Sequence, residues 1–154
     1  MLEPAGAGAP AYPAHLAALA DLAIARLPEL AAVLAELQAA IAACHARARQ
    51  AQDTDWPHIV ALYDALLQVA PSPVVALNRA VAVGMAEGPE AALALVDALA
   101  SDPLLRHYHW LPSVRGDLLA KLGRGDEARA EFERAASLTR NAQEKALLLA
   151  RACG

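Results

Sequence analysis

The chain has few aromatic residues and few cysteines. Aromatic side chains make up only 4% of its 154 residues, so the 57% of hydrophobic residues consists mainly of Ala, Leu and Val. Ala and Leu lose little side-chain entropy in a helix, and the composition therefore favours packed helices over sheets. The two cysteines, Cys44 and Cys153, form neither a disulfide framework nor a CxxC pair, which is typical of the reducing cytosol.

The chain also lacks an excess of positive charge. Its formal net charge is −4 and its pI is about 5.7, so its surface does not attract phosphate groups and we expect no direct nucleic acid binding. No basic segment precedes an apolar run and a cleavage site, as in a signal peptide. Charged residues and a proline interrupt the longest apolar stretch, from Leu16 to Cys44, which argues against a membrane span. We therefore predict a cytoplasmic protein that does not contact a membrane.

Proline and glycine divide the chain into helical segments. Residues 1–12 are rich in Ala, Gly and Pro and predict a flexible arm, and residues 13–154 predict a single helical domain. Apolar residues spaced three and four apart predict amphipathic helices, and Pro28 is expected to begin a helix of its own. Asn141, followed three residues later by Glu144, predicts a capping box. We expect about eight helices, at roughly 14–27, 28–50, 56–70, 73–86, 89–100, 110–122, 126–138 and 142–152.

Two of the helix pairs repeat. Arg79 aligns with Arg115, and Val96 with Phe132, at a spacing of 36 residues, while Tyr63 precedes Val96 by 33 residues. Periods of this length are typical of helix-turn-helix solenoids. The last unit matches the tetratricopeptide pattern of small and large residues at Gly116, Leu119, Gly123, Ala128, Phe132 and Ala135. We therefore predict an all-α fold of antiparallel helix pairs, stacked as a short tetratricopeptide-like solenoid.

Several motifs resemble one particular domain. They are LQAAIAACHA at 37–46, DTDWP at 53–57, ALYDALL at 61–67, PSPVVALNRAVAV at 71–83, GPEA at 88–91 and LTRNA at 138–142. From residue 37 onward the chain resembles the C-terminal tetratricopeptide-like extension of a group of bacterial extracytoplasmic-function RNA polymerase sigma factors. In such factors the DNA-reading and polymerase-binding regions precede this extension, and the sequence has no counterpart of them. The resemblance implies a regulatory module of transcription initiation whose partners are sigma-factor regions or RNA polymerase.

Four residues are candidate partner contacts: Asn78, Arg79, Trp110 and Arg115. The two arginines lie among apolar neighbours at equivalent repeat positions, and they could anchor an acidic partner segment. We favour the alternative that they brace adjacent helices by pairing with Asp64, Asp97 or Asp117, because charges at apolar positions are usually paired.

Trp110, like Trp56, begins a helix and is either a hydrophobic plug or an exposed binding anchor. In tetratricopeptide solenoids the first helix of each pair lines the concave surface. In this chain those helices carry Asn78, Arg79, Met85, Trp110, Ser113 and Lys121. We expect a partner to dock there, with Trp110 and Arg79 as anchors.

The sequence shows no catalytic motif. It contains no glycine-rich phosphate loop and no Ser/His/Asp arrangement, so we expect neither an enzyme nor a cofactor. His107 and His109 supply only two of the three or four ligands that zinc requires, so we expect no metal site. Two alternatives remain. One is a small-molecule or catalytic pocket inside the bundle, lined by Tyr63, His45 and Trp110, and the other is a stand-alone scaffold without a role in transcription.

Overall fold

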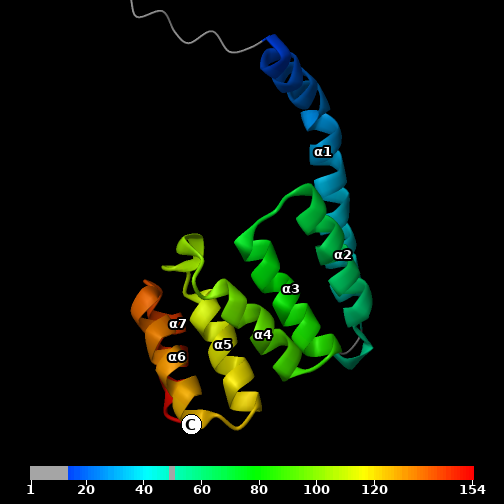
Figure 1. Cartoon of the computed structure of the whole chain (residues 1–154). Helices are drawn as coiled ribbons and strands as arrows, with labels where there is room; N and C mark the ends of the chain where they lie inside the picture. The colour runs from blue at the N-terminus through cyan, green and yellow to red at the C-terminus, as the bar shows by residue number, and fades with distance from the viewer. Residues whose placement is uncertain (1–13, 49–50) are drawn as a thin grey trace, which may run out of the picture.

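The computed structural model describes residues 14–48 and 51–154, which form seven α-helices and no strand (Figure 1). The helices are α1 (Ala14–Arg47), α2 (Trp56–Val69), α3 (Pro73–Ala86), α4 (Pro89–Leu99), α5 (Trp110–Lys121), α6 (Gly125–Leu138) and α7 (Ala142–Ala152). Two short 3₁₀ turns, η1 (Ala51–Asp53) and η2 (Pro103–Leu105), lie between them. The predicted all-α class is confirmed, whereas the predicted arm at 1–12 lies outside the described residues.

The helix ends follow the predicted punctuation. The carboxylate of Asp55 accepts a hydrogen bond from the backbone N–H of His58 at 3.0 Å and caps α2. Gly123 has a φ of 74° and ends α5: its N–H donates to the carbonyl of Ala120, and the next N–H donates to the carbonyl of Leu119. This pair of bonds is the Schellman motif, which satisfies carbonyls at a helix end and requires a residue that tolerates positive φ.

The capping box at α7 forms only in part. The side chain of Asn141 accepts from the backbone N–H groups of Gln143 and Glu144, as a helix cap should. The carboxylate of Glu144, however, does not return to Asn141. It accepts a hydrogen bond from the hydroxyl of Thr139 at 2.7 Å, and this hydroxyl in turn accepts from the N–H of Asn141.

The predicted break at Pro28 is wrong, because α1 is one helix of 34 residues with this proline inside it. A proline in a helix interior removes one backbone hydrogen bond and leaves a carbonyl without its usual donor. Every side chain from residue 25 to residue 33 is exposed, so water can reach that carbonyl. The surrounding Ala and Leu residues favour helix strongly, and the first two predicted helices therefore merge into one.

The helices stack in chain order. Each helix packs mainly on its neighbours in the chain, from α1 on α2 to α6 on α7, and α3 also contacts α5 (Figure 1). This arrangement of adjacent pairs agrees with the predicted solenoid-like fold. The C-terminal half of α1 packs on the bundle, and its N-terminal half projects beyond it (Figure 1).

Two clusters of buried side chains form the core. One joins α1, α2 and α3 around Ile59 and Leu66, and the other runs from α3 to α7. In the second cluster the ring of Phe132 on α6 lies so close to Gly116 on α5 that a Cβ atom at Gly116 would come within 2.7 Å of it. The small and the large residue of the repeat pattern therefore meet at the seam between α5 and α6.

The segment Ala25–Arg47 of α1 is long and apolar enough to cross a membrane, judged by length and composition alone. Only 6% of this apolar window is buried, although Leu34, Leu37 and Ile41 in its C-terminal half pack in the cluster that α1 shares with α2 and α3. The absence of membrane contact stays a prediction.

Candidate functional site

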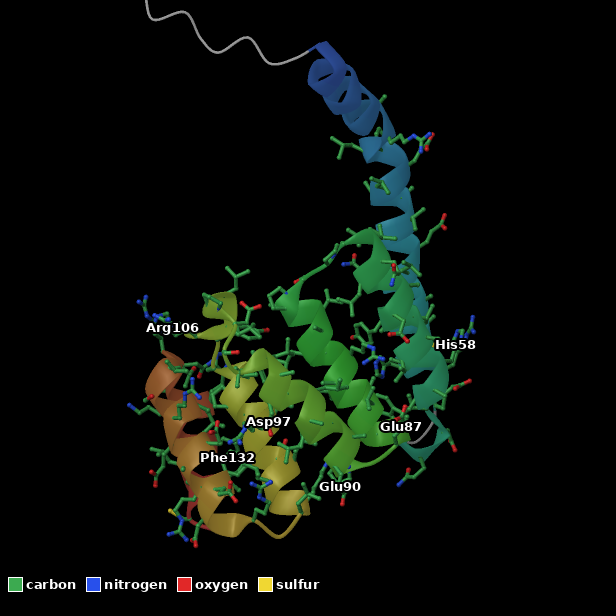
Figure 2. All side chains as sticks on the ribbon, in the orientation of Figure 1. His58, Glu87, Glu90, Asp97, Arg106 and Phe132 are labelled. Carbon is green, nitrogen blue, oxygen red and sulfur yellow. The ribbon has the colours of Figure 1, made fainter. Side chains whose placement is uncertain are left out.

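The two repeat-equivalent arginines are held in ion pairs. Nε of Arg79 on α3 donates to a carboxylate oxygen of Asp64 on α2 at 2.5 Å. Nε of Arg115 on α5 donates to Asp97 on α4 at 2.8 Å, and its Nη1 donates to Glu131 on α6 at 3.0 Å. Figure 2 labels Asp97 on its helix. The predicted pairing of both arginines with acidic residues of neighbouring helices is confirmed.

These ion pairs follow the repeat. Asp64 and Asp97 are 33 residues apart, the same spacing as Tyr63 and Val96, so each arginine bonds to the equivalent acid of the preceding even-numbered helix. The hydrogen bond to Asp97, together with the charges of Asp97 and Glu131, raises the pKa of Arg115. The arginines therefore brace successive helices against each other.

Three open hollows lie on the opposite side, between consecutive odd-numbered helices. The hollow between α1 and α3 has a volume of about 360 Å³, and those between α3 and α5 and between α5 and α7 have about 80 Å³ each. We call the surface formed by α1, α3, α5 and α7 the odd-helix face. Its lining residues include Gln38, Ala42, His45, Asn78, Val81, Met85, Val114, Asp117, Lys121, Trp110, Ser113, Leu147 and Arg151.

Equivalent repeat positions build the odd-helix face. Ala42, Asn78 and Val114 are spaced by 36 residues, and the next row is His45, Val81 and Asp117 at the same spacing. Each row takes one residue from each of three successive odd-numbered helices. The surface is therefore a property of the repeat and not an accident of one loop.

The odd-helix face exposes large apolar side chains. Trp110 is 49% exposed and Leu147 is 62% exposed, and Val81 and Met85 are also exposed. The ring of Trp110 lies beside that of His109, with 5.1 Å between the ring centroids. The alternative that Trp110 is a buried hydrophobic plug is therefore wrong. Trp56, by contrast, is half-buried and packs edge-on against His45.

Two charged groups of this face pair with each other. Arg151 on α7 forms an ion pair with Asp117 on α5. Glu144 accepts from Thr139 and lies 3.4 Å from Nε2 of His109, a nitrogen with no hydrogen-bond partner among the described residues. The face is therefore apolar with a balanced polar rim, which is the composition typical of protein-docking surfaces.

The structure divides the four predicted contact residues between two sides. Asn78 and Trp110 line hollows of the odd-helix face. Arg79 lines a separate hollow formed by α2, α3 and α4, and Arg115 bonds to α4 and α6. The expectation of one surface carrying both Trp110 and Arg79 is wrong, because adjacent residues such as Asn78 and Arg79 point about 100° apart around a helix.

The predicted pocket lined by Tyr63, His45 and Trp110 does not form. Tyr63 and His45 line the hollow between α1 and α3, but Trp110 lies in the hollow between α5 and α7. Burial raises the pKa of Tyr63. Within the described part of the chain, no three His, Cys, Asp or Glu side chains group closely enough to hold a metal ion.

Sequence reasoning missed Leu147 and Arg151 as surface residues of the site. The repeat gives no signal for them, because α7 follows α5 at a different spacing.

The chain has a relative of undetermined function. It is 53% identical over 113 residues to an uncharacterized protein of Rhizobium meliloti (strain 1021), and this match covers 73% of the chain. The chain spans about a quarter of the length of this curated relative, 26%. No family model and no solved structure matches the chain.

Proposed function

We propose that this chain is a protein-docking, regulatory module of transcription initiation, which binds sigma-factor regions or RNA polymerase through the odd-helix face. The motifs from residue 37 onward supply the link to transcription, because they resemble the C-terminal extension of extracytoplasmic-function sigma factors. The relative from Rhizobium meliloti extends far beyond the matched region, as expected of a module joined to other domains. The proposed role is non-enzymatic.

The observation that carries docking is the exposed apolar surface on successive odd-numbered helices. Trp110 and Leu147 flank one hollow, and Val81 and Met85 flank the next. Exposed tryptophans are enriched among the residues that dominate binding energy at protein interfaces. We therefore assign the anchor role to Trp110, with Asn78 as a polar contact. Arg79 and Arg115 then act indirectly, by fixing the helices.

The test measures binding of the chain to two purified probes. One probe is the core RNA polymerase of Rhizobium meliloti, and the other is the part of the relative outside the matched region. We expect saturable binding to at least one of them. Trp110→Ala and Leu147→Ala should each weaken it about thirtyfold or more, because a central anchor contributes about 2 kcal/mol or more.

The matched control is Leu149→Ala. Leu149 lies on α7 and is exposed like Leu147, but it lines none of the three hollows. Its substitution should leave binding unchanged. Failure to bind either probe would overturn the link to transcription, and equal weakening by all three variants would overturn the assignment of the face. Duplex DNA should not bind at physiological salt.

A further inference from the structure

Helix α1 is much longer than the helix on which it packs. It has 34 residues and α2 has 14, which correspond to lengths of about 51 Å and about 21 Å. Among the α1 side chains that the structure describes, from residue 25 onward, Leu34 is the first that packs into the core with α2, and the helix before it projects beyond the bundle (Figure 1). We call residues 14–33 the α1 overhang.

One row of apolar residues runs along α1 through both parts. Leu34, Leu37, Ile41 and Cys44 are spaced three and four apart and pack against α2 and α3. The same spacing continues back to Leu30 and Leu27, which are 47% and 57% exposed. Together these six residues occupy the a and d positions of a heptad pattern, the arrangement by which one helix packs along another. The overhang therefore continues an interface that the structure already contains.

The heptad spacing of this row indicates what kind of segment packs on it. A heptad seam accommodates a helix lying nearly parallel or antiparallel to α1, since side chains of one helix must fill the spaces of the other. Further towards the N-terminus, the sequence places Ala23 and Ala20 on the same heptad positions. In an antiparallel pair of overhangs, the positions of Leu27 and Leu30 in one copy come opposite those of Ala23 and Ala20 in the other. Large residues then face small ones, as a closely packed helix pair requires.

We propose that two copies of this chain associate through their α1 overhangs, in an antiparallel two-helix contact centred between Ala23 and Leu27. Such a contact is isologous, with the same surface used by both copies. It leaves the odd-helix faces of both copies unchanged, and it does not rest on the proposed role in transcription.

The first experiment is sedimentation equilibrium of the whole chain over a wide range of concentration. The mass should rise from the monomer value of 16.1 kDa to twice that value as the concentration increases. The double variant Leu27→Glu, Leu30→Glu should remain a monomer at every concentration, because it places four carboxylates in the contact. Both leucines lie outside the core, so its melting temperature should equal that of the wild type at concentrations at which the wild type is a monomer.

The matched control is Ala25→Glu, Ala32→Glu. Both alanines are exposed and lie on the same stretch of α1, at heptad positions on the far side from the seam. This variant adds the same charge to the same helix and should dimerise as the wild type does. A monomeric wild type, a seam variant that still dimerises, or equal loss in both variants would each overturn the proposal.

Cross-linking tests the antiparallel register. In a background with Cys44 and Cys153 replaced by Ala, copies carrying Leu27→Cys are mixed with copies carrying Ala23→Cys. The mixed disulfide should exceed both symmetric ones, whereas a parallel pair would favour the symmetric ones. The competing hypothesis is that lipid covers this surface, and neutral phosphatidylcholine vesicles test it. If the wild type stays monomeric and sediments with the vesicles, and the Leu27→Glu, Leu30→Glu variant does not, the overhang is a lipid-binding surface and the proposal is wrong.

Discussion

Truncating Phe132 to Ala tests the seam between the last helix pairs. The ring is 3% exposed and lies directly against Gly116 on α5, and the guanidinium carbon of Arg151 on α7 lies 4.5 Å from its centroid. Removal of a buried aromatic ring costs about 3–5 kcal/mol, through lost burial and the cavity left behind. One wall of this cavity is the α5 backbone at Gly116, which cannot relax as a side chain can. We therefore expect a value towards the upper end of that range.

Urea and thermal unfolding followed by circular dichroism measure this effect. For a domain of this size, each kcal/mol of destabilisation lowers the melting temperature by about 2–4 °C. The slope of unfolding free energy against urea concentration should not change, because the variant exposes about the same surface area on unfolding. Leu149→Ala, at an exposed position, is the control and should stay within about 0.5 kcal/mol of the wild type. A loss below about 1 kcal/mol for Phe132→Ala would refute the alignment of Phe132 with the buried Val96.

The other predictions concern the same packing and its charges. Gly116→Ala should destabilise by about 1–3 kcal/mol because its Cβ would overlap Phe132, whereas Gly125→Ala, whose Cβ would meet no atom within 4 Å, should be tolerated. Ultraviolet titration should show Tyr63 ionising above the usual tyrosine pKa near 10, and Tyr63→Phe should abolish that step. Burial favours the neutral phenol of Tyr63 in the folded state. The free energy of unfolding should therefore keep its full value below the unfolded pKa of about 10, and it should fall as pH rises from there through the raised pKa. Arg115→Ala should lower the free energy of unfolding by about 1–3 kcal/mol, because it removes the hydrogen bonds to Asp97 and Glu131 and leaves Glu131 with only the more distant Arg134 as a cationic partner.

The sequence predicted most helices because their ends depend on local chemistry. Pro73 begins α3 and Gly123 terminates α5, and each acts through its own backbone geometry, which needs no knowledge of the fold. Pro28 shows the limit of such rules. Whether an internal proline ends a helix depends on whether water or a neighbour can compensate the lost hydrogen bond, and this depends on exposure that only the folded arrangement defines.

The candidate site was predictable only at the level of helices. Asn78, Arg79, Trp110 and Arg115 do lie on the first helices of two pairs, as expected. Which side of a helix faces a partner depends, however, on how the adjacent helices cover it. The acids next to Arg79 and Arg115 could be proposed from their spacing, but the ion pair between Asp117 and Arg151 could not, because it depends on how α7 lies against α5.

The two sides of the solenoid have different physical roles that support each other. On the side of the even-numbered helices, Arg79 and Arg115 tie each pair to the preceding one through Asp64 and Asp97. These bonds fix the relative rotation of the pairs, and that rotation sets the distance between successive odd-numbered helices. A partner that binds the odd-helix face then meets hollows that already exist, so that little ordering entropy opposes binding. Loss of an arginine should accordingly weaken binding through the geometry of the face, even though no arginine of this side touches the partner.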